Sequence, residues 1–354
     1  MEKQTMDLPA PPPGCKKRLQ RLREQSPRLR NLLLVALLYA VFAVPIAGGS
    51  INRYYSGILI MICINVILTV SLNLVSGFLG QLVLGHAGFM SVGAYAAALF
   101  AMHSGLPPAV SFPLGLALGG LTAALFGFCI GVPALRLHGD YLAIITLGFG
   151  EIIRVLILAV PFTGGARGLT VKTTISRRPF AFFTWAFALA ALTAFVVYAF
   201  IHSRHGRAVV AIREDEIAAE ASGINTTYYK LMTFVLSAFM AGVAGGLYAS
   251  HVGALTPVKF DFNYSTEILV MVVLGGMASI TGSVVSATVL TVLPEVLRGF
   301  SAYRMLAYSI ILILVMLFRP SGLMGERELS IEKLAGFFRA RFGARRADGG
   351  KGDA

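Results

Sequence analysis

Residues 57–75 read GILIMICINVILTVSLNLV, an apolar run without a charged side chain. A helix of about 20 such residues, rising 1.5 Å per residue, crosses the roughly 30 Å of hydrocarbon in a bilayer. Similar runs recur along the 354-residue chain. The ten predicted spans lie at about 31–48, 57–75, 83–103, 111–133, 140–161, 180–202, 230–252, 266–280, 282–298 and 304–319. We therefore predict an all-α polytopic membrane protein.

The composition excludes an ordinary soluble protein. Hydrophobic residues make up 56% of the chain and charged residues only 13%, about half the usual share of a soluble domain. Cys15, Cys63 and Cys129 have no metal-ligand spacing, so we predict no bound metal. Residues 1–30 lack the short apolar segment and cleavage site of a signal peptide, and we expect them to stay attached.

The eighth and ninth spans are the weakest predictions, because the segment between them, LGGMASITGS at 274–283, is small and polar. Short, broken or re-entrant helices would explain it. Gly85, Gly88, Gly275 and Gly276 belong to clusters of small residues within the spans. Such residues let helix backbones approach closely where lipid supplies no hydrophobic drive for association.

The positions of lysine and arginine predict the topology. Of the 30 such residues, 21 lie before the first span, after the tenth, or in two loops on the same side. The positive-inside rule makes that side cytoplasmic, with both termini. The expected organisation is a basic tail at 1–30, a membrane domain at 31–320 with a cytoplasmic loop at 203–230, and a second basic tail at 321–354. The formal charge of +13 then favours anionic lipid headgroups over nucleic acid as the contact of these tails.

The cytoplasmic loop carries the most informative pattern. Residues 211–221 are predicted to form a short helix that ends at Gly223, with Ile212 and Ile217 on its apolar side. Its polar side has Arg213, Glu214, Asp215, Glu216 and Glu220. At about three turns this helix is marginal in water by itself. We expect it to pack on its own bundle or on a partner, and an ordinary connector is the alternative.

Six segments, in the same order, resemble the permease subunits of bacterial branched-chain amino acid ABC importers, the LivM type. They are GFLGQLVLGHAGFMSVGAY at 77–95, GDYLAIITLGFGEIIR at 139–154, TGGARGL at 163–169, the loop at 206–230, LGGMASITG at 274–282 and RPSGL at 319–323. The resemblance extends over nearly all of residues 50–325.

The resemblance implies a permease that moves leucine, isoleucine and valine across the inner membrane by alternating access. It implies four partners: a second homologous permease, two ATPase subunits and a periplasmic solute-binding protein. It also identifies the loop as the segment that couples to an ATPase, through Arg213, Glu214, Asp215, Glu216, Ala218, Ala219, Glu220 and Gly223. Ile217-Ala-Ala stands where importers generally have Glu-Ala-Ala, which is a departure from that pattern. Related permeases serve urea, amides or other amino acids, and these substrates remain alternatives.

The chain has no phosphate-binding loop of its own. The only Gly-Lys pair, Gly350-Lys351, is followed by glycine rather than by the pattern of a nucleotide site. We therefore expect this chain to bind no cofactor, with ATP and Mg²⁺ held by partner subunits. A secondary transporter driven by an ion gradient is the alternative. No nucleophile, base and orienting group fall at recognisable spacing, so we predict no catalytic residues and no enzyme activity.

Three ionisable residues lie within predicted spans: His86, Glu151 and Arg154. The last two are three residues apart, close enough to pair on one helix face. Structural pairing, lining of the translocation path and proton coupling are the alternatives for them. His86 is predicted to form a hydrogen bond between helices, because no second metal ligand is near in sequence. Together with Gly85, Gly88, Gly275 and Gly276, these residues are candidates for the translocation path or for helix packing.

The segment TGGARGL at 163–169 is predicted to lie on the periplasmic side. Gly164 and Gly165 permit a tight turn, and Arg167 offers several hydrogen-bond donors. Contact with the solute-binding protein or with the mouth of the path is one interpretation. An ordinary turn is the other.

Overall fold

The computed structural model describes residues 35–48, 52–137, 139–171, 179–300 and isolated positions between 306 and 323. The chain divides into two units, Met1–Asn52 and Arg53–Ala354. In the first unit the described residues form one apolar helix, Val35–Ala47, which lies inside the predicted first span. Cys15, the two basic tails and most of the tenth predicted span lie outside the described residues.

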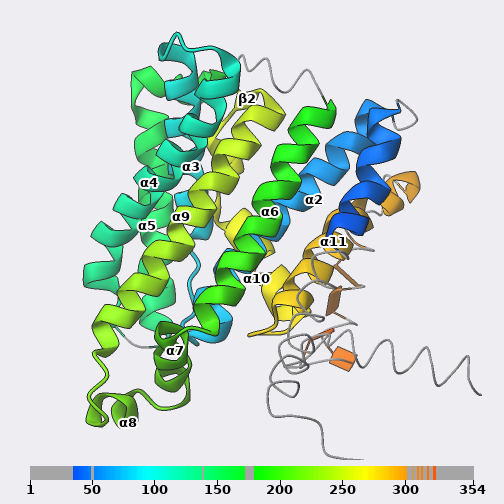
Figure 1. Ribbon diagram of the computed structural model, residues 1–354. Helices are drawn as coiled ribbons and strands as arrows, with labels where there is room; N and C mark the ends of the chain where they lie inside the picture. Colours follow the sequence, from blue (N-terminus) through cyan, green and yellow to red (C-terminus); the bar gives the residue numbers. More distant parts are fainter. Residues whose placement is uncertain are drawn as a thin grey trace, which may run out of the picture. The chain divides into compact units, whose positions relative to one another are not determined.

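The second unit is almost entirely helical (Figure 1). Its long helices are α2 (Arg53–Asn73), α3 (His86–His103), α4 (Pro108–Ala134), α5 (Asp140–Ala159), α6 (Pro179–Ile201), α9 (Thr226–Val252), α10 (Phe262–Gly275) and α11 (Ile280–Val296). Two shorter helices, α7 (Arg204–Glu214) and α8 (Glu216–Ala221), join α6 to α9. Two-residue strands, β1 (Leu169–Thr170) and β2 (Ala254–Leu255), pair in antiparallel orientation. Single turns of 3-10 helix occur at Pro161–Thr163, Gly165–Arg167, Pro257–Lys259 and Leu297–Phe300.

Helices α3, α4 and α9 pack against one another and form the most closely associated part of the unit. A Cβ atom on Gly93 of α3 would lie 2.3 Å from the Gly242 Cα of α9. A Cβ atom on Gly245 would lie 2.0 Å from the Met90 carbonyl oxygen. Both distances are far inside van der Waals contact, so glycine is what lets these two backbones touch.

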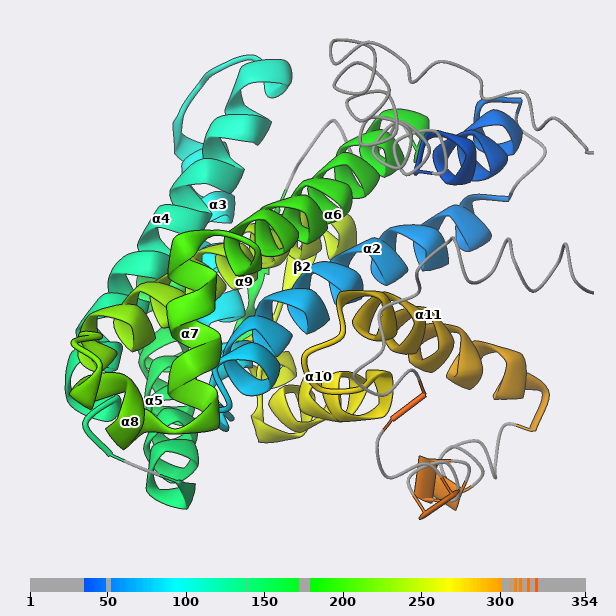
Figure 2. The same ribbon diagram turned by 60° about the horizontal axis from the view of Figure 1, so that its bottom comes forward.

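Helix α2 packs against four other helices, α6, α9, α10 and α11 (Figure 2). All of its residues from Cys63 to Asn73 are buried, and apolar residues occur on every side of this part of the helix. A helix that is hydrophobic all round belongs in the interior of a membrane bundle. The opening apolar run of the sequence is therefore a central helix rather than a lipid-facing one.

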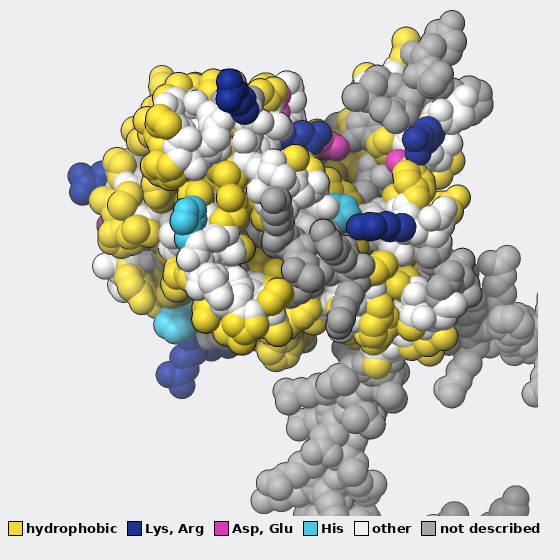
Figure 3. All heavy atoms as spheres, turned by 90° about the horizontal axis from the view of Figure 1, so that it is seen from above, with side chains coloured by type: hydrophobic (Ala, Val, Ile, Leu, Met, Phe, Trp, Pro, Cys, Tyr) yellow, Lys and Arg dark blue, Asp and Glu magenta, His cyan; other side chains and the backbone are white. Residues whose placement is uncertain are grey.

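In the described part of the chain, six helices are long and apolar enough to cross a membrane: Arg53–Phe78, Pro108–Ala134, Asp140–Ala159, Pro179–Ile201, Thr226–Val252 and Ile280–Gly299. Large apolar side chains such as Leu121, Leu125 and Phe195 are exposed on them. Figure 3, a view from above, shows hydrophobic side chains over much of this end of the molecule, with a few charged side chains among them. The all-α polytopic fold is confirmed. The count of ten crossings stays a prediction, because α3 and α10 do not meet the same criterion among the described residues.

The helical structure of the chain is interrupted at two places near one end of this bundle. Helix α2 continues as a π-helix, Leu74–Phe78, and an extended segment then leads to α3. Helix α10 ends at Gly275 after 14 residues, shorter than a full crossing, and α11 begins at Ile280. The prediction of short or broken helices at 274–283 is confirmed. Ala278 between them has a positive φ of 64°, which is strained for a residue with a side chain.

Candidate functional site

The loop at 203–230 forms two helices rather than one. The predicted single helix at 211–221 is wrong because the chain is extended at Asp215 (φ −157°, ψ 111°). The Asp215 Oδ1 atom accepts hydrogen bonds from the backbone N–H groups of Ile217 (2.9 Å) and Ala218 (3.0 Å). An aspartate that caps the next helix in this way interrupts the one before it. In Figure 1, α7 and α8 form a bent pair at the end of the bundle opposite β2.

The end of α8 is fixed by Gly223, as predicted. Its φ of +84° is left-handed. The Gly223 N–H donates to the Glu220 carbonyl (2.9 Å) and the Ile224 N–H to the Ala219 carbonyl (3.1 Å), which is the hydrogen-bond pattern of a Schellman motif. Asn225 then caps α9 by accepting from the Tyr228 N–H (3.1 Å). Both ends of α8 are therefore held by specific hydrogen bonds.

A buried ion pair joins α8 to the membrane helix that follows it. The Lys230 side chain is only 2% exposed, and its Nζ atom lies 2.5 Å from the Glu216 Oε1 atom. A lysine is rarely buried to this degree unless its charge has a partner. This bond ties the start of α8 to the first turns of α9. Glu216 is one of the residues predicted for this site, whereas Lys230 is not among them.

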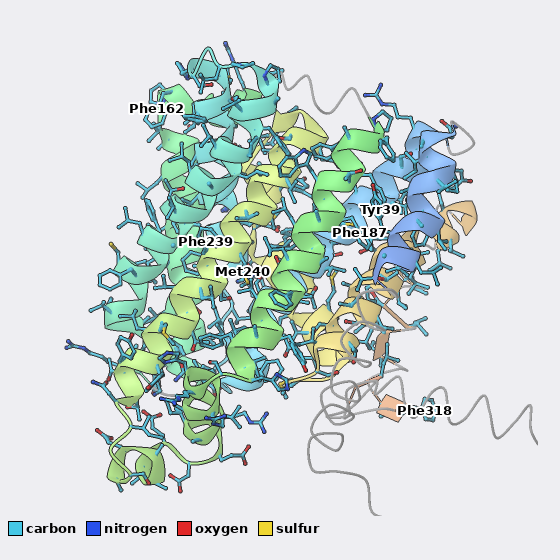
Figure 4. All side chains as sticks on the ribbon, viewed as in Figure 1. Tyr39, Phe162, Phe187, Phe239, Met240 and Phe318 are labelled. Atoms are coloured by element: carbon cyan, nitrogen blue, oxygen red, sulfur yellow. The ribbon has the colours of Figure 1, made fainter. Side chains whose placement is uncertain are left out.

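The faces of the two helices differ in exposure. Ile212 is 5% exposed and packs inward, as predicted, whereas Ile217 is 82% exposed, so its assignment to an apolar inner side is wrong. Ala219 takes the buried position on α8, at 4%. Glu214, Ala218 and Glu220 are exposed. Figure 4 shows side chains that end in nitrogen or oxygen gathered around α7 and α8, away from the apolar middle of α9 at Phe239 and Met240.

Arg213 connects this loop to the interruption between α2 and α3. Its Nη2 atom lies 2.6 Å from Glu214 Oε1, and its Nη1 atom donates to the Gly77 carbonyl at 3.4 Å. The aliphatic part of the side chain lies against Gly80, where an added Cβ atom would come within 2.7 Å of the Arg213 Cγ atom. The C-terminal end of α7 is thus in direct contact with the segment that interrupts the helices between α2 and α3.

Asn73 connects the two interruptions to each other. Its Nδ2 atom donates to the Ser279 carbonyl (3.0 Å) and to Ser283 Oγ (2.8 Å), and its Oδ1 atom accepts from the Ala278 N–H (3.0 Å). Gly77 packs against the same turn, since a Cβ atom there would lie 2.3 Å from Ala278 N. One side chain at the end of α2 therefore holds the turn between α10 and α11.

His86 forms the predicted hydrogen bond between helices. Its Nε2 atom lies 2.9 Å from Ser71 Oγ of α2, and the residue is 1% exposed. No cluster of metal-ligating side chains occurs within the described ranges. Gly85 and Gly88 on either side of it lie against Thr146 and Gly150 of α5. These three candidate residues lie at contacts between helices, and their role in a translocation path stays a prediction.

Glu151 and Arg154 form the predicted pair, with Glu151 Oε2 and Arg154 Nε 2.7 Å apart and both side chains about one quarter to one third exposed (32% and 26%). The second carboxylate oxygen of Glu151 accepts from the Phe262 N–H at 3.1 Å. Glu151 thus fixes the start of α10. Gly275 and Gly276 lie at the other end of that helix, where Gly275 touches Gly282 of α11.

The segment at 163–169 forms a tight turn near the strand pair, at the end of the bundle opposite α8. Gly164 and Gly165 both have positive φ, and Arg167 is exposed. Leu169 pairs with Leu255, whose carbonyl oxygen accepts from the Tyr95 hydroxyl at 3.4 Å. Figure 4 shows Phe162 at this end of the bundle. The turn is confirmed, and its contact with a binding protein stays a prediction.

Residues 54–319 match the family model described as branched-chain amino acid transport system / permease component. The chain belongs to this family. It is therefore a multi-pass membrane permease and not an enzyme, in agreement with the sequence analysis.

Individual relatives agree with this assignment. The permease is 38% identical to the "High-affinity branched-chain amino acid transport system permease protein LivM" of Salmonella typhimurium, over 83% of this chain and 75% of the relative. The protein of the same name from Escherichia coli K12 is also 38% identical over the same shares. A second permease protein of S. typhimurium, LivH, is 35% identical over 40% of this chain and 45% of its own length. No solved structure matches the chain.

The Glu216–Lys230 pair permits a test of how α8 is held. Glu216→Ala leaves the ammonium of a nearly fully buried lysine without its carboxylate, and we expect local opening of α8 to become easier by about 3 kcal/mol. Lys230→Met should cost less, because the Glu216 side chain is 31% exposed and can turn to water. Hydrogen exchange of the α8 amides measures both changes.

The double variant is the control. Replacing both residues removes the charge that is left buried in Glu216→Ala, so the double variant should protect α8 better than that single variant does. Equal exchange rates in the two single variants would contradict a buried lysine as the origin of the effect.

Proposed function

We propose that this permease is the transmembrane subunit of an ATP-driven importer that moves leucine, isoleucine and valine across the inner membrane by alternating access. Membership of the family supports the transport role and the substrate class. The single structural observation that carries the coupling mechanism is Arg213, which joins the α7–α8 loop to the break between α2 and α3.

The proposed assembly contains a second homologous permease, two ATPase subunits that hold ATP and Mg²⁺, and a periplasmic solute-binding protein. The names of the relatives support two kinds of permease, since LivM and LivH are both branched-chain amino acid permease proteins. The absence of a phosphate-binding loop from this sequence supports separate ATPase subunits. Gly164, Gly165 and Arg167 are the proposed contact with the solute-binding protein or the mouth of the path.

The proposed topology has ten crossings and cytoplasmic tails at 1–30 and 321–354. Its support is the distribution of basic residues in the sequence. The strand pair of 169–170 with 254–255 brings two of the predicted outer loops together, and the contact of Arg213 with Gly77 brings two of the predicted inner segments together. Each contact joins segments that the topology assigns to the same side.

In the proposed mechanism, closure of the ATPase dimer displaces α7 and α8 as one piece. The caps of α8 and the Glu216–Lys230 bond make the loop stiff enough to transmit that displacement. Arg213 passes it to Gly77 and Gly80, and Asn73 passes it to the turn between α10 and α11. Packed helices then move as rigid units between inward-open and outward-open arrangements.

A gradient-driven secondary transporter remains the second candidate, because Glu151 is an ionisable residue on a membrane helix. Its carboxylate bonds both Arg154 and the Phe262 N–H. Both carboxylate oxygens of Glu151 are engaged in these contacts within the protein, as expected for a structural pair rather than for a group on an ion path. The geometry therefore favours the importer over this alternative.

Uptake into proteoliposomes distinguishes the two candidates. We expect leucine uptake only when the ATPase subunits, the second permease and the loaded binding protein are all present with ATP. Charge reversal at Glu214 or Asp215 should leave ATP hydrolysis but reduce uptake by about tenfold or more, because these side chains form the exposed surface of the coupling loop. Uptake by this chain alone would refute the importer.

A further inference from the structure

Glu267 is an acidic residue within the membrane part of the chain, on the 14-residue helix α10. Phe262, the first residue of α10, donates its N–H to Glu151, which lies near the middle of α5. Because α5 is long enough to cross the membrane, α10 begins about half-way across. In many membrane transporters, broken helices at this depth form the substrate site.

The Glu267 side chain lies on the side of α10 that faces the protein. Tyr264 and Met271, three residues before it and four after it, share its face of the helix. Both are buried, at 6% and 1% exposed. The Met271 Sδ atom accepts a hydrogen bond from the Thr69 hydroxyl of α2 at 3.5 Å, and α10 lies beside α2 (Figure 2). Glu267 therefore belongs to the face of α10 that packs towards the central helix, where it is half-buried.

The Glu267 carboxylate has no partner of its own. No residue in the described part of the chain forms a hydrogen bond or an ion pair with it. Its charged neighbours, Lys259 and Asp261, have opposite signs. Lys259 Nζ lies 5.8 Å from the centre of the Tyr264 ring, and Asp261 Oδ1 accepts from the Tyr264 N–H at 3.0 Å. An ionisable side chain within a membrane is costly and marks a substrate or ion pathway.

The chemistry of the transported amino acids fits such a carboxylate. Leucine, isoleucine and valine each carry an ammonium group, which forms charge-assisted hydrogen bonds with a carboxylate. A bound Ca²⁺ ion would instead need six or more oxygen ligands. No group of three or more metal-ligating side chains occurs among the residues that the structure describes. An organic ammonium group is therefore the better ligand for Glu267.

We propose that Glu267 binds the ammonium group of the amino acid as the substrate passes through the permease. The proposal rests on the proposed function, because it requires that amino acids cross the membrane through this subunit. The substrate then supplies the opposite charge that the protein does not. The residue also selects among substrates, since urea and simple amides have no ammonium group to offer.

The test compares variants in the complete importer, reconstituted with its ATPase subunits, the second permease and the leucine-loaded binding protein. Glu267→Gln should reduce ATP-dependent leucine uptake by about tenfold or more, as expected for loss of a charge-assisted hydrogen bond. ATP hydrolysis should continue, because the loop at 203–230 is unchanged. Glu295→Gln is the matched control. Glu295 is bonded to Arg298 on the exposed surface (3.2 Å), and its loss should change uptake by less than about twofold.

Thermal unfolding of the same complexes separates substrate binding from a structural role. Glu267→Gln removes an unpaired charge and breaks no bond, so the unfolding midpoint should stay the same or rise. A carboxylate that held the bundle together would give a lower midpoint instead. Loss of uptake together with a lowered midpoint would therefore contradict the ammonium site.

A leucine analogue with a diazirine in its side chain gives a direct measurement. After delivery by the binding protein and illumination, it should crosslink to α10 or α2 in the wild-type complex and much less in Glu267→Gln. Equal crosslinking in the two, or normal uptake by Glu267→Gln, would refute the ammonium site and leave the importer intact. A wild-type complex without ATP-dependent leucine uptake would instead refute the proposed function.

Discussion

Gly245→Ala is expected to lower the stability of the folded permease by about 2 kcal/mol or more, a typical cost of overpacking. The added Cβ atom would lie 2.0 Å from the Met90 carbonyl oxygen and 2.8 Å from the Ala94 nitrogen, both backbone atoms of α3. Neither atom can turn aside as a flexible side chain can, so α3 and α9 must separate. Thermal unfolding of the detergent-purified protein should show a midpoint several degrees lower.

Gly148→Ala is the matched control for this substitution. Gly148 also lies within a membrane helix, α5, but an added Cβ atom there meets nothing within 4 Å. Alanine is better than glycine in a helix by up to about 1 kcal/mol, so this variant should be as stable as wild type or more so. An equal lowering of the midpoint in both variants would contradict close packing of α3 on α9 as the cause of the loss.

The glycine contacts show which features of helix packing can be predicted from the sequence and which cannot. Small residues within apolar runs predict close helix packing, and Gly85, Gly88 and Gly275 do lie at helix contacts. The pattern cannot say which helix each one meets. Gly245 meets Met90, more than 150 positions earlier in the chain, and one sequence carries no signal for such a pairing. The run at 57–75 likewise predicts a helix but not its continuation as a π-helix to Phe78.

The loop at 203–230 shows a different limit of prediction from sequence. Ile212 and Ile217 were assigned to one apolar side because both are hydrophobic and lie within a helical segment. The structure breaks the helix at Asp215 between them, which turns Ile217 outward. A signal was available, because aspartate followed by another acidic residue is typical of a helix N-terminus.

Asn73→Ala is expected to reduce leucine uptake by about tenfold or more in the assembled importer while ATP hydrolysis continues. The substitution removes all three hydrogen bonds to Ser279, Ser283 and Ala278. It leaves the half-buried Ala278 N–H without its partner, at a cost of about 1–3 kcal/mol, whereas the Ser279 carbonyl keeps the Ser283 N–H and hydroxyl. The turn is then no longer held to the end of α2 against which Arg213 lies. The number of leucine molecules transported per ATP hydrolysed measures the effect.

A loss of uptake could also arise from a generally weakened bundle, and Asn65→Ala separates the two causes. Asn65 lies two turns earlier on the same helix, is 5% exposed, and donates to Thr291 Oγ1 of α11 at 2.8 Å. Its loss removes the bonds to Thr291 and to the Tyr264 hydroxyl of α10 (3.4 Å) but leaves the two helix interruptions joined to each other. We therefore expect both variants to unfold at lowered temperatures, with normal transport per ATP only in Asn65→Ala. If Asn65→Ala were equally uncoupled, the link between the two breaks would not be the route by which the loop drives transport.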